Sequence, residues 1–352
     1  MRAPQLPYKP RDPKRYRPNI GLIGCGGITK HHLIAYRKAG YSVVALCDVV
    51  PYRARKRKAE FFPRAKVYGD YRELLQRDDV EVVDITTHPA PRAAMIEAAL
   101  EAGKHVLSQK PFVLDLDIGQ RLVDLAERRN VKLAVNQNGR WAPHFSYIRQ
   151  AVRAGLIGEV AAAHLAVHWD HGWVKGTEFE KIRHLILYDF AVHWFDIVRC
   201  FMGERTARRV YASVARSPAQ QVSPPLLAQV LIEYDAAQAS LVFDADTRFG
   251  PQDRTYVNGS RGTITSLGSG LKDQKVTLST GEGRARPRLV GRWFSDGFHG
   301  TMGELLSAIE EDREPLHSGR DNLDTLSLCF AAVASAERHE PVVPGTVRKM
   351  PG

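Results

Sequence analysis

The chain has 352 residues, of which 44% are hydrophobic and 25% charged, and its formal net charge at pH 7 is +11. This balance is ordinary for a globular protein, and the length predicts two domains because single cores rarely grow beyond about 250 residues. We find no apolar run long enough to span a bilayer and no secretory signal pattern, so we expect a cytoplasmic protein without a membrane partner. The four cysteines are widely scattered and predict reduced thiols and no metal site of the paired-cysteine type.

The positive charge is concentrated in two segments. Residues 1–18 carry six basic side chains and one acidic one, and their regularly spaced prolines predict an extended arm. Such an arm either wraps a neighbouring subunit or is disordered. Residues 53–66 carry seven basic side chains and one acidic one, on a predicted surface helix. Because zinc-finger spacing and RNA-recognition aromatic motifs are missing, these segments predict solvated surface and no nucleic-acid partner.

Residues 19–137 alternate short β-branched runs with helical patterns. The strand-like runs are NIGLI, SVVALC, VEVVDIT, KHVLS and KLAVNQ, and helical patterns such as ITKHHLIAYRKA and PRAAMIEAALEAG separate them. The runs lack polar alternation, which is typical of strands buried on both faces. This rhythm predicts a doubly wound parallel sheet of the Rossmann type over 19–137.

A glycine-rich turn follows the first predicted strand. GCGGIT has a strand before it, a helix after it, and Asp48 at the end of the second strand, 24 positions beyond Gly24. Gly24 would allow the tight turn, and backbone amides at the start of the helix would face a pyrophosphate. The residues predicted to hold a dinucleotide here are Gly24, Gly26, Gly27, Ile28 and Asp48. The Asp48 carboxylate favours NAD, while nearby Arg53 and Arg55 keep NADP as an alternative.

The pattern changes after residue 138. A helix near 143–154 leads into EVAAAHLAVHW, whose residues alternate between two faces, and further strand-like runs continue to about residue 280. We expect residues 138–345 to form an α+β domain with a large, mostly antiparallel open sheet. His164 and His168 are four positions apart on an extended strand, too far for easy joint coordination, so no metal is expected.

One helical segment of the second half carries polar residues on an apolar background. In LILYDFAVHWFDIVRCFMG, Asp189, His193 and Asp196 have the spacing i, i+4, i+7 and should share a helix face. The spacing alone leaves two interpretations open: a buried, hydrogen-bonded histidine of the core, or a catalytic group.

Several stretches together resemble the glucose–fructose oxidoreductase / inositol dehydrogenase / rhizopine catabolism (Gfo/Idh/MocA) family. They are GCGGITKHH, EAALEAGKHVLSQKP, DFAVHWFD, NGSRGTI and the segment from GELLSAIEED to AERHEPV, in order between residues 19 and 345. The resemblance implies an NAD(P)-dependent oxidoreductase that transfers a hydride between nicotinamide and a secondary hydroxyl of a sugar, cyclitol or glycoside.

The resemblance also implies roles for individual residues. The family usually has Glu-Lys-Pro where this chain has Gln109, Lys110 and Pro111. Lys110 would bind the reacting oxygen, and Gln109 would lie beside the cofactor. Thr87 and His88, in a loop where relatives commonly have Thr-Pro and a later His, would line the cofactor cleft; the later position is Arg92 in this chain.

The family pattern Asp-x-Gly-x-His-x-x-Asp matches the second-half helix, except that Ala191 replaces Gly. It implies that His193 is the general base and that Asp189 orients the site, and imidazole suits proton transfer near neutral pH. Polar and aromatic side chains nearby are candidates for binding sugar hydroxyls and ring faces. These candidates are Arg140, Trp141, Asp170, His171 and Trp173.

Two alternative functions compete with the dehydrogenase. An NAD-dependent glycosidase would use transient oxidation, and a non-catalytic nucleotide-binding regulator would explain Gln109 and Ala191. Retention of Lys110, Asp189 and His193 argues against the regulator. By resemblance, we expect a homodimer or homotetramer formed through the C-terminal sheet.

Overall fold

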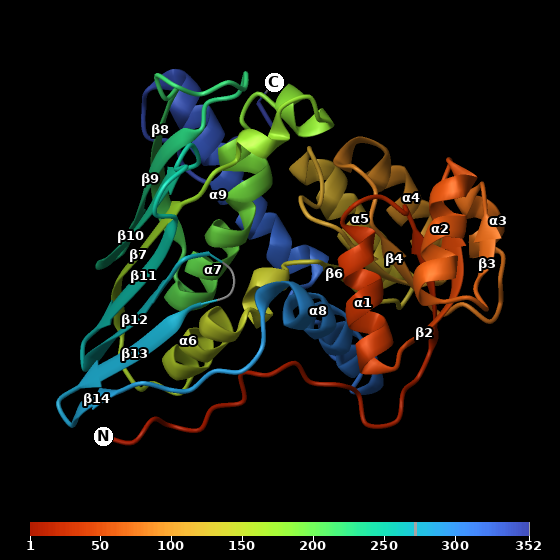
Figure 1. The fold of residues 1–352 in the computed structure, drawn as a ribbon, viewed down its shortest axis with the longest axis horizontal. Helices are drawn as coiled ribbons and strands as arrows, with labels where there is room; N and C mark the ends of the chain where they lie inside the picture. Colours follow the sequence, from red (N-terminus) through yellow and green to blue (C-terminus); the bar gives the residue numbers. More distant parts are fainter. Residues whose placement is uncertain (271–272, 352) are drawn as a thin grey trace. The chain divides into compact units, whose positions relative to one another are not determined.

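The computed structural model describes residues 1–270 and 273–351 (Figure 1). The chain divides into two compact units that are described separately. The first, called the Rossmann unit, comprises Lys9–Trp141 and Phe294–Leu323. The second, called the sheet unit, comprises Met1–Tyr8, Ala142–Trp293 and the residues from Asp324 onward.

The Rossmann unit is built on a six-stranded sheet in the order β3-β2-β1-β4-β5-β6, with every pair parallel. This order is that of a doubly wound dinucleotide-binding sheet and confirms the predicted fold class. Its short central strands are buried on both faces, as their lack of polar alternation predicts. The strands are β1 (Asn19–Ile23), β2 (Ser42–Cys47), β3 (Lys66–Tyr68), β4 (Val82–Ile85), β5 (His105–Ser108) and β6 (Leu133–Val135).

Helices connect these strands. Some begin at clear signals: Asp115 caps α5 by accepting hydrogen bonds from two amides, and Pro51 opens α2. Apolar residues of α1 and α8 share one core with β1 and β2, in which Tyr36 and Phe298 are fully buried. The helices are α1 (Thr29–Ala39), α2 (Pro51–Phe61), α3 (Tyr71–Leu75), α4 (Pro89–Glu101), α5 (Leu116–Arg128), the 3₁₀ turn η1 (Asn138–Trp141) and α8 (Trp293–Glu310).

Two segments distant in sequence pack within the Rossmann unit. Most of α8 belongs to it, although residues 138–345 were expected to form one domain. The second part of the proline arm lies along α8, where the Glu310 carboxylate accepts hydrogen bonds from the amides of Lys14, Arg15 and Tyr16. These amides hold the pKa of Glu310 below its usual range. The arm is therefore an extended strap on its own chain.

The sheet unit contains an eight-stranded sheet in the order β14-β13-β12-β11-β7-β10-β9-β8. All neighbours are antiparallel except β7 and β10, which confirms the mostly antiparallel prediction. The strands are β7 (Val160–His168), β8 (Ala207–Ala215), β9 (Leu227–Tyr234), β10 (Ala237–Asp244), β11 (Gln252–Gly259), β12 (Gly262–Gly268), β13 (Lys275–Thr280) and β14 (Gly283–Ala285).

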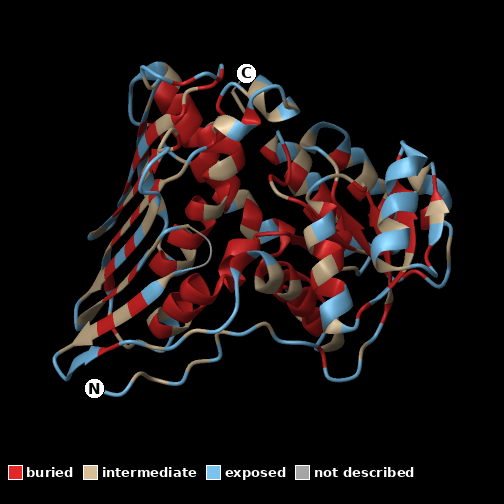
Figure 2. Cartoon of the chain, viewed as in Figure 1, coloured by how far each residue is buried: buried red, intermediate tan, exposed pale blue. Residues whose placement is uncertain are grey.

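One face of this sheet is covered by helices and the other is not (Figures 1 and 2). Along β9, buried and exposed residues alternate strictly, so one row of side chains packs inward and the other faces outward. The remaining elements are α6 (Pro143–Arg153), η2 (Gly172–Val174), η3 (Glu178–Lys181), η4 (Leu185–Phe190), α7 (Val192–Met202) and α9 (Gly319–Arg338). No helix in the described part of the chain combines the length and apolar character needed to cross a membrane.

The segment predicted as one helix with Asp189, His193 and Asp196 on a common face differs from that expectation. It consists of a π-helical turn, η4, followed by the α-helix α7. The amide of Ala191 donates to the carbonyl of Ile186, five residues earlier, at 2.8 Å. This wider turn changes the angular relation between Asp189 and His193 from that of a regular α-helix.

Candidate active site

The glycine turn between β1 and α1 requires a residue without a side chain at its first position. Gly24 has a φ of +95°, and a Cβ there would lie 3.0 Å from the carbonyl carbon of Thr86. The hydroxyls of Thr29 and Thr86 donate to the Gly24 carbonyl at 2.9 and 2.6 Å. Thr29 is fully buried, so its hydroxyl is accommodated at the helix–strand contact by these bonds. The turn is thus tied to the loop after β4.

The next part of the turn leaves room for a ligand backbone. A Cβ built on Gly26 or Gly27 would meet no atom within 4 Å. Ile28 is the N-cap residue that directly precedes α1, and amides at a helix N-terminus attract a pyrophosphate. These features fit a dinucleotide, as the sequence predicts.

Asp48 lies at the end of β2 and is buried. Its two carboxylate oxygens accept hydrogen bonds from the amides of Cys25, at 2.7 Å, and Val50, at 2.8 Å. Burial, with a smaller contribution from Asp48, raises the pKa of the Cys25 thiol to about 12. Each oxygen of Asp48 has a second lone pair available for a ribose hydroxyl, so the position fits NAD.

A further basic residue reaches the turn from α2. Arg53 and Arg55 are exposed, whereas Arg57 extends its guanidinium to the Gly26 carbonyl at 2.8 Å. Arg57 also pairs with Glu60 at 2.8 Å. The sequence pointed to Arg53 and Arg55 as the arginines nearest to Asp48. The residue that contacts the glycine turn is Arg57, which lies one helical turn beyond Arg53.

The loop after β4 carries Thr87 and His88. His88 is exposed and precedes α4, while Thr87 offers its carbonyl to the guanidinium of Arg92. Arg92 is 1% exposed and also donates to the carbonyls of Gln109, at 2.7 Å, and Pro111. One buried side chain therefore joins the loops that follow β4 and β5. The sequence showed an arginine at position 92, where relatives commonly have a histidine, but it did not predict that Arg92 joins these two loops.

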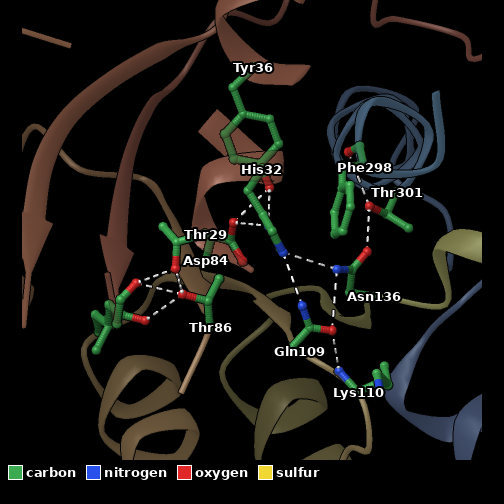
Figure 3. A network of polar contacts seen from close by, with 12 residues as sticks. Thr29, His32, Tyr36, Asp84, Thr86, Gln109, Lys110, Asn136, Phe298 and Thr301 are labelled. Carbon is green, nitrogen blue, oxygen red and sulfur yellow. Dashed lines mark hydrogen bonds and ion pairs between the residues drawn. The ribbon is translucent and has the colours of Figure 1, made fainter. Parts of the chain in front are cut away.

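Lys110 follows β5 at the carboxyl edge of the parallel sheet, where open α/β sheets bind ligands. Its amide donates to Oε1 of Gln109 at 2.7 Å, and the peptide bond to Pro111 is cis. Gln109 is buried and belongs to a network with His32 and Asn136 (Figure 3). This network contacts the lysine turn through the hydrogen bond between the Lys110 amide and Gln109.

Arg140 and Trp141 are buried in the Rossmann unit. The Arg140 guanidinium pairs with Asp321 and donates to the carbonyl of Leu316. Trp141 packs so closely on Gly300 that a Cβ there would overlap the indole. These contacts within the unit connect η1 to α8 and to the start of α9.

In the sheet unit, Asp189 is buried in η4 and His193 lies in the first turn of α7. The His193 ring meets the Trp293 ring edge to face, with centroids 5.8 Å apart. Asp196 is buried and accepts a hydrogen bond from the Thr325 hydroxyl at 3.2 Å, which ties α7 to α9. Asp196 therefore has a structural contact, whereas His193 is only partly buried.

Two of the predicted substrate residues form an aromatic cluster with Phe190. The rings of His171 and Phe190 are 4.3 Å apart, and Trp173 contacts both rings while remaining 55% exposed. Burial lowers the pKa of His171 to about 4, against smaller opposing effects of Asp170 and Asp189. His171 is therefore neutral near pH 7. Asp170 is exposed and accepts a hydrogen bond from the amide of Gly172.

Comparison with protein families gives a match for each half of the chain. Residues 18–137 match the oxidoreductase family with an NAD-binding Rossmann fold, and residues 145–265 match the GFO/IDH/MocA C-terminal domain. The chain belongs to the Gfo/Idh/MocA family. It is accordingly an NAD(P)-dependent oxidoreductase, and NAD is the cofactor that its Rossmann unit fits.

Named relatives of this Gfo/Idh/MocA oxidoreductase match along most of their length. D-apiose dehydrogenase of Paraburkholderia graminis is 28% identical, over 91% of this chain and 88% of its own. Inositol 2-dehydrogenase of Rhizobium meliloti is 26% identical, over 91% of this chain and 98% of its own.

Solved structures agree in fold. An Agrobacterium radiobacter oxidoreductase in complex with NAD⁺, L-tartaric acid and magnesium has a TM-score of 0.84 at 23% identity, covering 94% of this chain and 99% of its own. Levoglucosan dehydrogenase in complex with NADH has a TM-score of 0.77 at 20% identity, with the same coverage. At these identities the likeness establishes the fold.

Sequence reasoning missed several residues of this Gfo/Idh/MocA chain that surround the predicted groups. Trp194 and Trp293 both contact the His193 ring, but isolated aromatic residues give no sequence signal of that contact. Asp253 lies in β11, and burial raises the pKa of its carboxyl to about 7, against a hydrogen bond from Trp169 that lowers it. An aspartate within a strand was a signal that could have identified this position.

Proposed function

We propose that this chain transfers a hydride between a secondary hydroxyl of a sugar, cyclitol or glycoside and NAD. The observation that carries the substrate class is the match, over 91% of the chain, to a D-apiose dehydrogenase and to an inositol 2-dehydrogenase. Apiose and inositol are polyhydroxylated, so the common chemistry is oxidation of a carbinol carbon among other hydroxyls. The open glycine turn and Asp48 support NAD, and Arg57 is an additional contact of that turn.

Different residues are proposed to bind different parts of the NAD molecule. Amides of Gly26, Gly27 and Ile28 would face the pyrophosphate, and Asp48 would accept from the adenosine ribose. Thr87, His88 and Gln109 follow β4 and β5 and would border the nicotinamide end. The bound nicotinamide supplies the hydride acceptor, and the protein supplies position and electrostatic field.

We assign the proton chemistry to two side chains. His193 takes the hydroxyl proton of the substrate as general base, with Asp189 orienting the site. Lys110 donates a hydrogen bond to the same oxygen, and its positive charge stabilises the alkoxide that develops as the hydride leaves carbon. In the reverse direction His193 returns the proton to the alkoxide. Both assignments come from the family pattern and are supported by Lys110 lying at the carboxyl edge of the parallel sheet.

The substrate ring is proposed to contact the aromatic cluster of the sheet unit. Trp173 is half exposed and offers an indole face against which the C–H edges of a sugar pack. The neutral His171 imidazole beside it has one donor and one acceptor nitrogen, so it can donate a hydrogen bond to a substrate hydroxyl or accept one from it. Asp170 is a further hydroxyl acceptor. Arg140 and Trp141 are proposed to act indirectly, by fixing the segment between β6 and α6.

We also propose that two or four copies associate through the uncovered face of the large sheet, in a cytoplasmic protein. Strand registers place four exposed apolar residues on this face, in two neighbouring pairs with Ser240 and His164 between them, and such exposed apolar side chains support an interaction site. They are Tyr211, Leu231, Tyr256 and Leu267. Analytical ultracentrifugation of the wild type and of Leu231→Glu tests this proposal, which predicts that the variant dissociates.

A substrate screen tests the proposed reaction. Sugars, sugar acids, cyclitols and glycosides are each incubated with NAD⁺ and with NADP⁺, and reduced nicotinamide is followed by absorbance. The proposal predicts reduction of NAD⁺ by at least one polyol. Cleavage of a glycosidic bond without net reduction would favour the glycosidase, and tight NAD binding without turnover on any compound at any pH would favour the regulator.

A further inference from the structure

A chain of buried polar side chains leads from β4, through α1, to the lysine turn (Figure 3). It begins at Asp84 in β4, continues through His32 in α1, and reaches Gln109 and Asn136, which follow β5 and β6. His32, Asp84 and Asn136 are fully buried, and Gln109 is 5% exposed. Uncharged polar groups so far from water are costly unless each donor meets an acceptor. The pairing in this chain can therefore be worked out atom by atom.

The contacts of Gln109 fix the orientation of its side-chain amide. The Lys110 amide can only donate, so the atom 2.7 Å from it must be the carbonyl oxygen Oε1 of Gln109. The NH₂ group of Gln109 then faces Nε2 of His32 at 3.0 Å. Asn136 also directs its NH₂ group toward Nε2, at 3.2 Å, while its oxygen accepts from the Thr301 hydroxyl at 2.9 Å.

These orientations determine the protonation state of His32. Two donors face Nε2, so this nitrogen must be an acceptor and carry no proton. The ring proton is then on Nδ1, which lies 2.7 Å from the Asp84 carboxylate. The Asp84 carboxylate also accepts a hydrogen bond from the Tyr36 hydroxyl, at 2.7 Å, and ends the chain of polar contacts. His32 is thus a neutral imidazole in the Nδ1–H form, and a second proton would face two N–H donors.

We propose that His32 is a positioning residue for Lys110: its neutral imidazole holds Gln109, whose oxygen fixes the main chain of the lysine turn. The inference rests on the proposed role of Lys110 and deepens it. The lysine side chain starts from a Cα whose direction is set by the bond between the Lys110 amide and Gln109. Losing the acceptor at Nε2 releases Gln109, so the amine of Lys110 is no longer held in one place.

Side chains from several elements surround the His32 ring. The ring lies against Phe298 of α8 with centroids 4.4 Å apart, which excludes water from that side. The titratable, charged and polar groups that face the ring or adjoin it are Asp84 from β4, Tyr36 and His31 from α1, Gln109 after β5, and Asn136 after β6.

Nitrogen NMR of the protein without substrate tests the proton assignment directly. In the wild type, ¹⁵N-labelled His32 should show a protonated Nδ1 and an unprotonated Nε2. In Gln109→Glu, one carboxylate oxygen keeps the Lys110 amide and the other faces Nε2, so both ring nitrogens should be protonated. A doubly protonated His32 in the wild type would overturn the proposal.

Steady-state kinetics test the positioning role. His32→Phe keeps a ring but removes the acceptor, and should lower kcat about tenfold to a hundredfold, as expected for a misplaced catalytic group. The dissociation constant of NAD should change by less than about threefold, since the glycine turn is untouched. His32→Gln, whose carbonyl can accept from Gln109, should recover part of the loss. Lys38→Phe, at an exposed position of the same helix outside the network, is the matched control and should keep the wild-type kcat.

A lysine variant separates this inference from the proposed function. If Lys110→Ala retains the wild-type rate, the proposed role of Lys110 is wrong, whatever His32 does. If Lys110→Ala is inactive but His32→Phe retains the wild-type kcat, only the positioning role fails. In Lys110→Ala, adding His32→Phe should not reduce the residual rate further, whereas an independent structural role would reduce it in both backgrounds.

Discussion

Substitution of Arg92 tests whether its guanidinium holds together the loops that follow β4 and β5. Its guanidinium is 1% exposed and donates to the carbonyls of Thr87, Gln109 and Pro111. In Arg92→Met the apolar stem is largely kept, but the carbonyls of Thr87 and Pro111 lose their donor, while the Gln109 carbonyl keeps only the Ser108 hydroxyl at 3.0 Å. Each unsatisfied buried acceptor costs about 1–3 kcal/mol, and relaxation recovers part of the sum for the two carbonyls left without a donor, so we expect a loss of about 2–4 kcal/mol in unfolding free energy.

Chemical denaturation with tryptophan fluorescence measures this loss. Arg92→Lys retains the charge but cannot reach three carbonyls with a planar fork, so it should fall between the wild type and Arg92→Met. Arg64→Met, an exposed arginine of the same unit, is the control and should change the unfolding free energy by less than about 0.5 kcal/mol. If Arg92→Met is as stable as Arg64→Met, the loops do not depend on this guanidinium and the reasoning is refuted.

Three further predictions concern the turn, the cofactor and a buried carboxyl. Gly24→Ala, strained by a φ of +95° and a 3.0 Å contact, should lose about 1–3 kcal/mol of stability and weaken NAD binding in calorimetry; wild-type binding would contradict it. Asp48→Ser should raise the ratio of NADP to NAD in kcat/KM by about tenfold, and an unchanged ratio would remove Asp48 from cofactor choice. The raised pKa of Asp253, about 7, means that the folded chain binds a proton which the unfolded chain releases above about pH 4. The stability that this carboxyl contributes is thus present at low pH and is lost as the pH rises through 7. The unfolding free energy of Asp253→Asn relative to the wild type should therefore grow from about pH 4 to 7, reach at most about 4 kcal/mol and then level off. Equal pH dependence of the two proteins in denaturation would refute this prediction.

The parallel sheet was predictable because its information is local. Each buried strand is a short β-branched run, and the glycine turn combines a required positive φ at Gly24 with an acid at the end of the next strand. Three-residue strands such as β3 and β14 carry too little pattern to be recognised. The pairing of β7 with β10 as the parallel pair likewise depends on contacts between distant segments.

The parts that local pattern could not predict are those decided by packing. The π turn at Leu185–Phe190 has the composition of an ordinary apolar helix, and only its five-residue hydrogen bond distinguishes it. His32 and Arg92 resemble surface residues of amphipathic helices, yet His32 is buried against α8, far along the chain, and Arg92 is buried against the loops that follow β4 and β5. Their partners are main-chain atoms and amides around the lysine turn, which sequence spacing does not bring together.

Single-turnover measurement on Lys110→Ala and His193→Ala tests whether these two side chains carry the proton chemistry of hydride transfer. With the best substrate found in the screen, each variant is mixed with saturating NAD⁺ and the formation of reduced nicotinamide is followed, while calorimetry measures NAD affinity. We expect that hydride transfer is lost in both variants and that NAD still binds with nearly wild-type affinity. Near-normal rates of hydride transfer in both variants would contradict it.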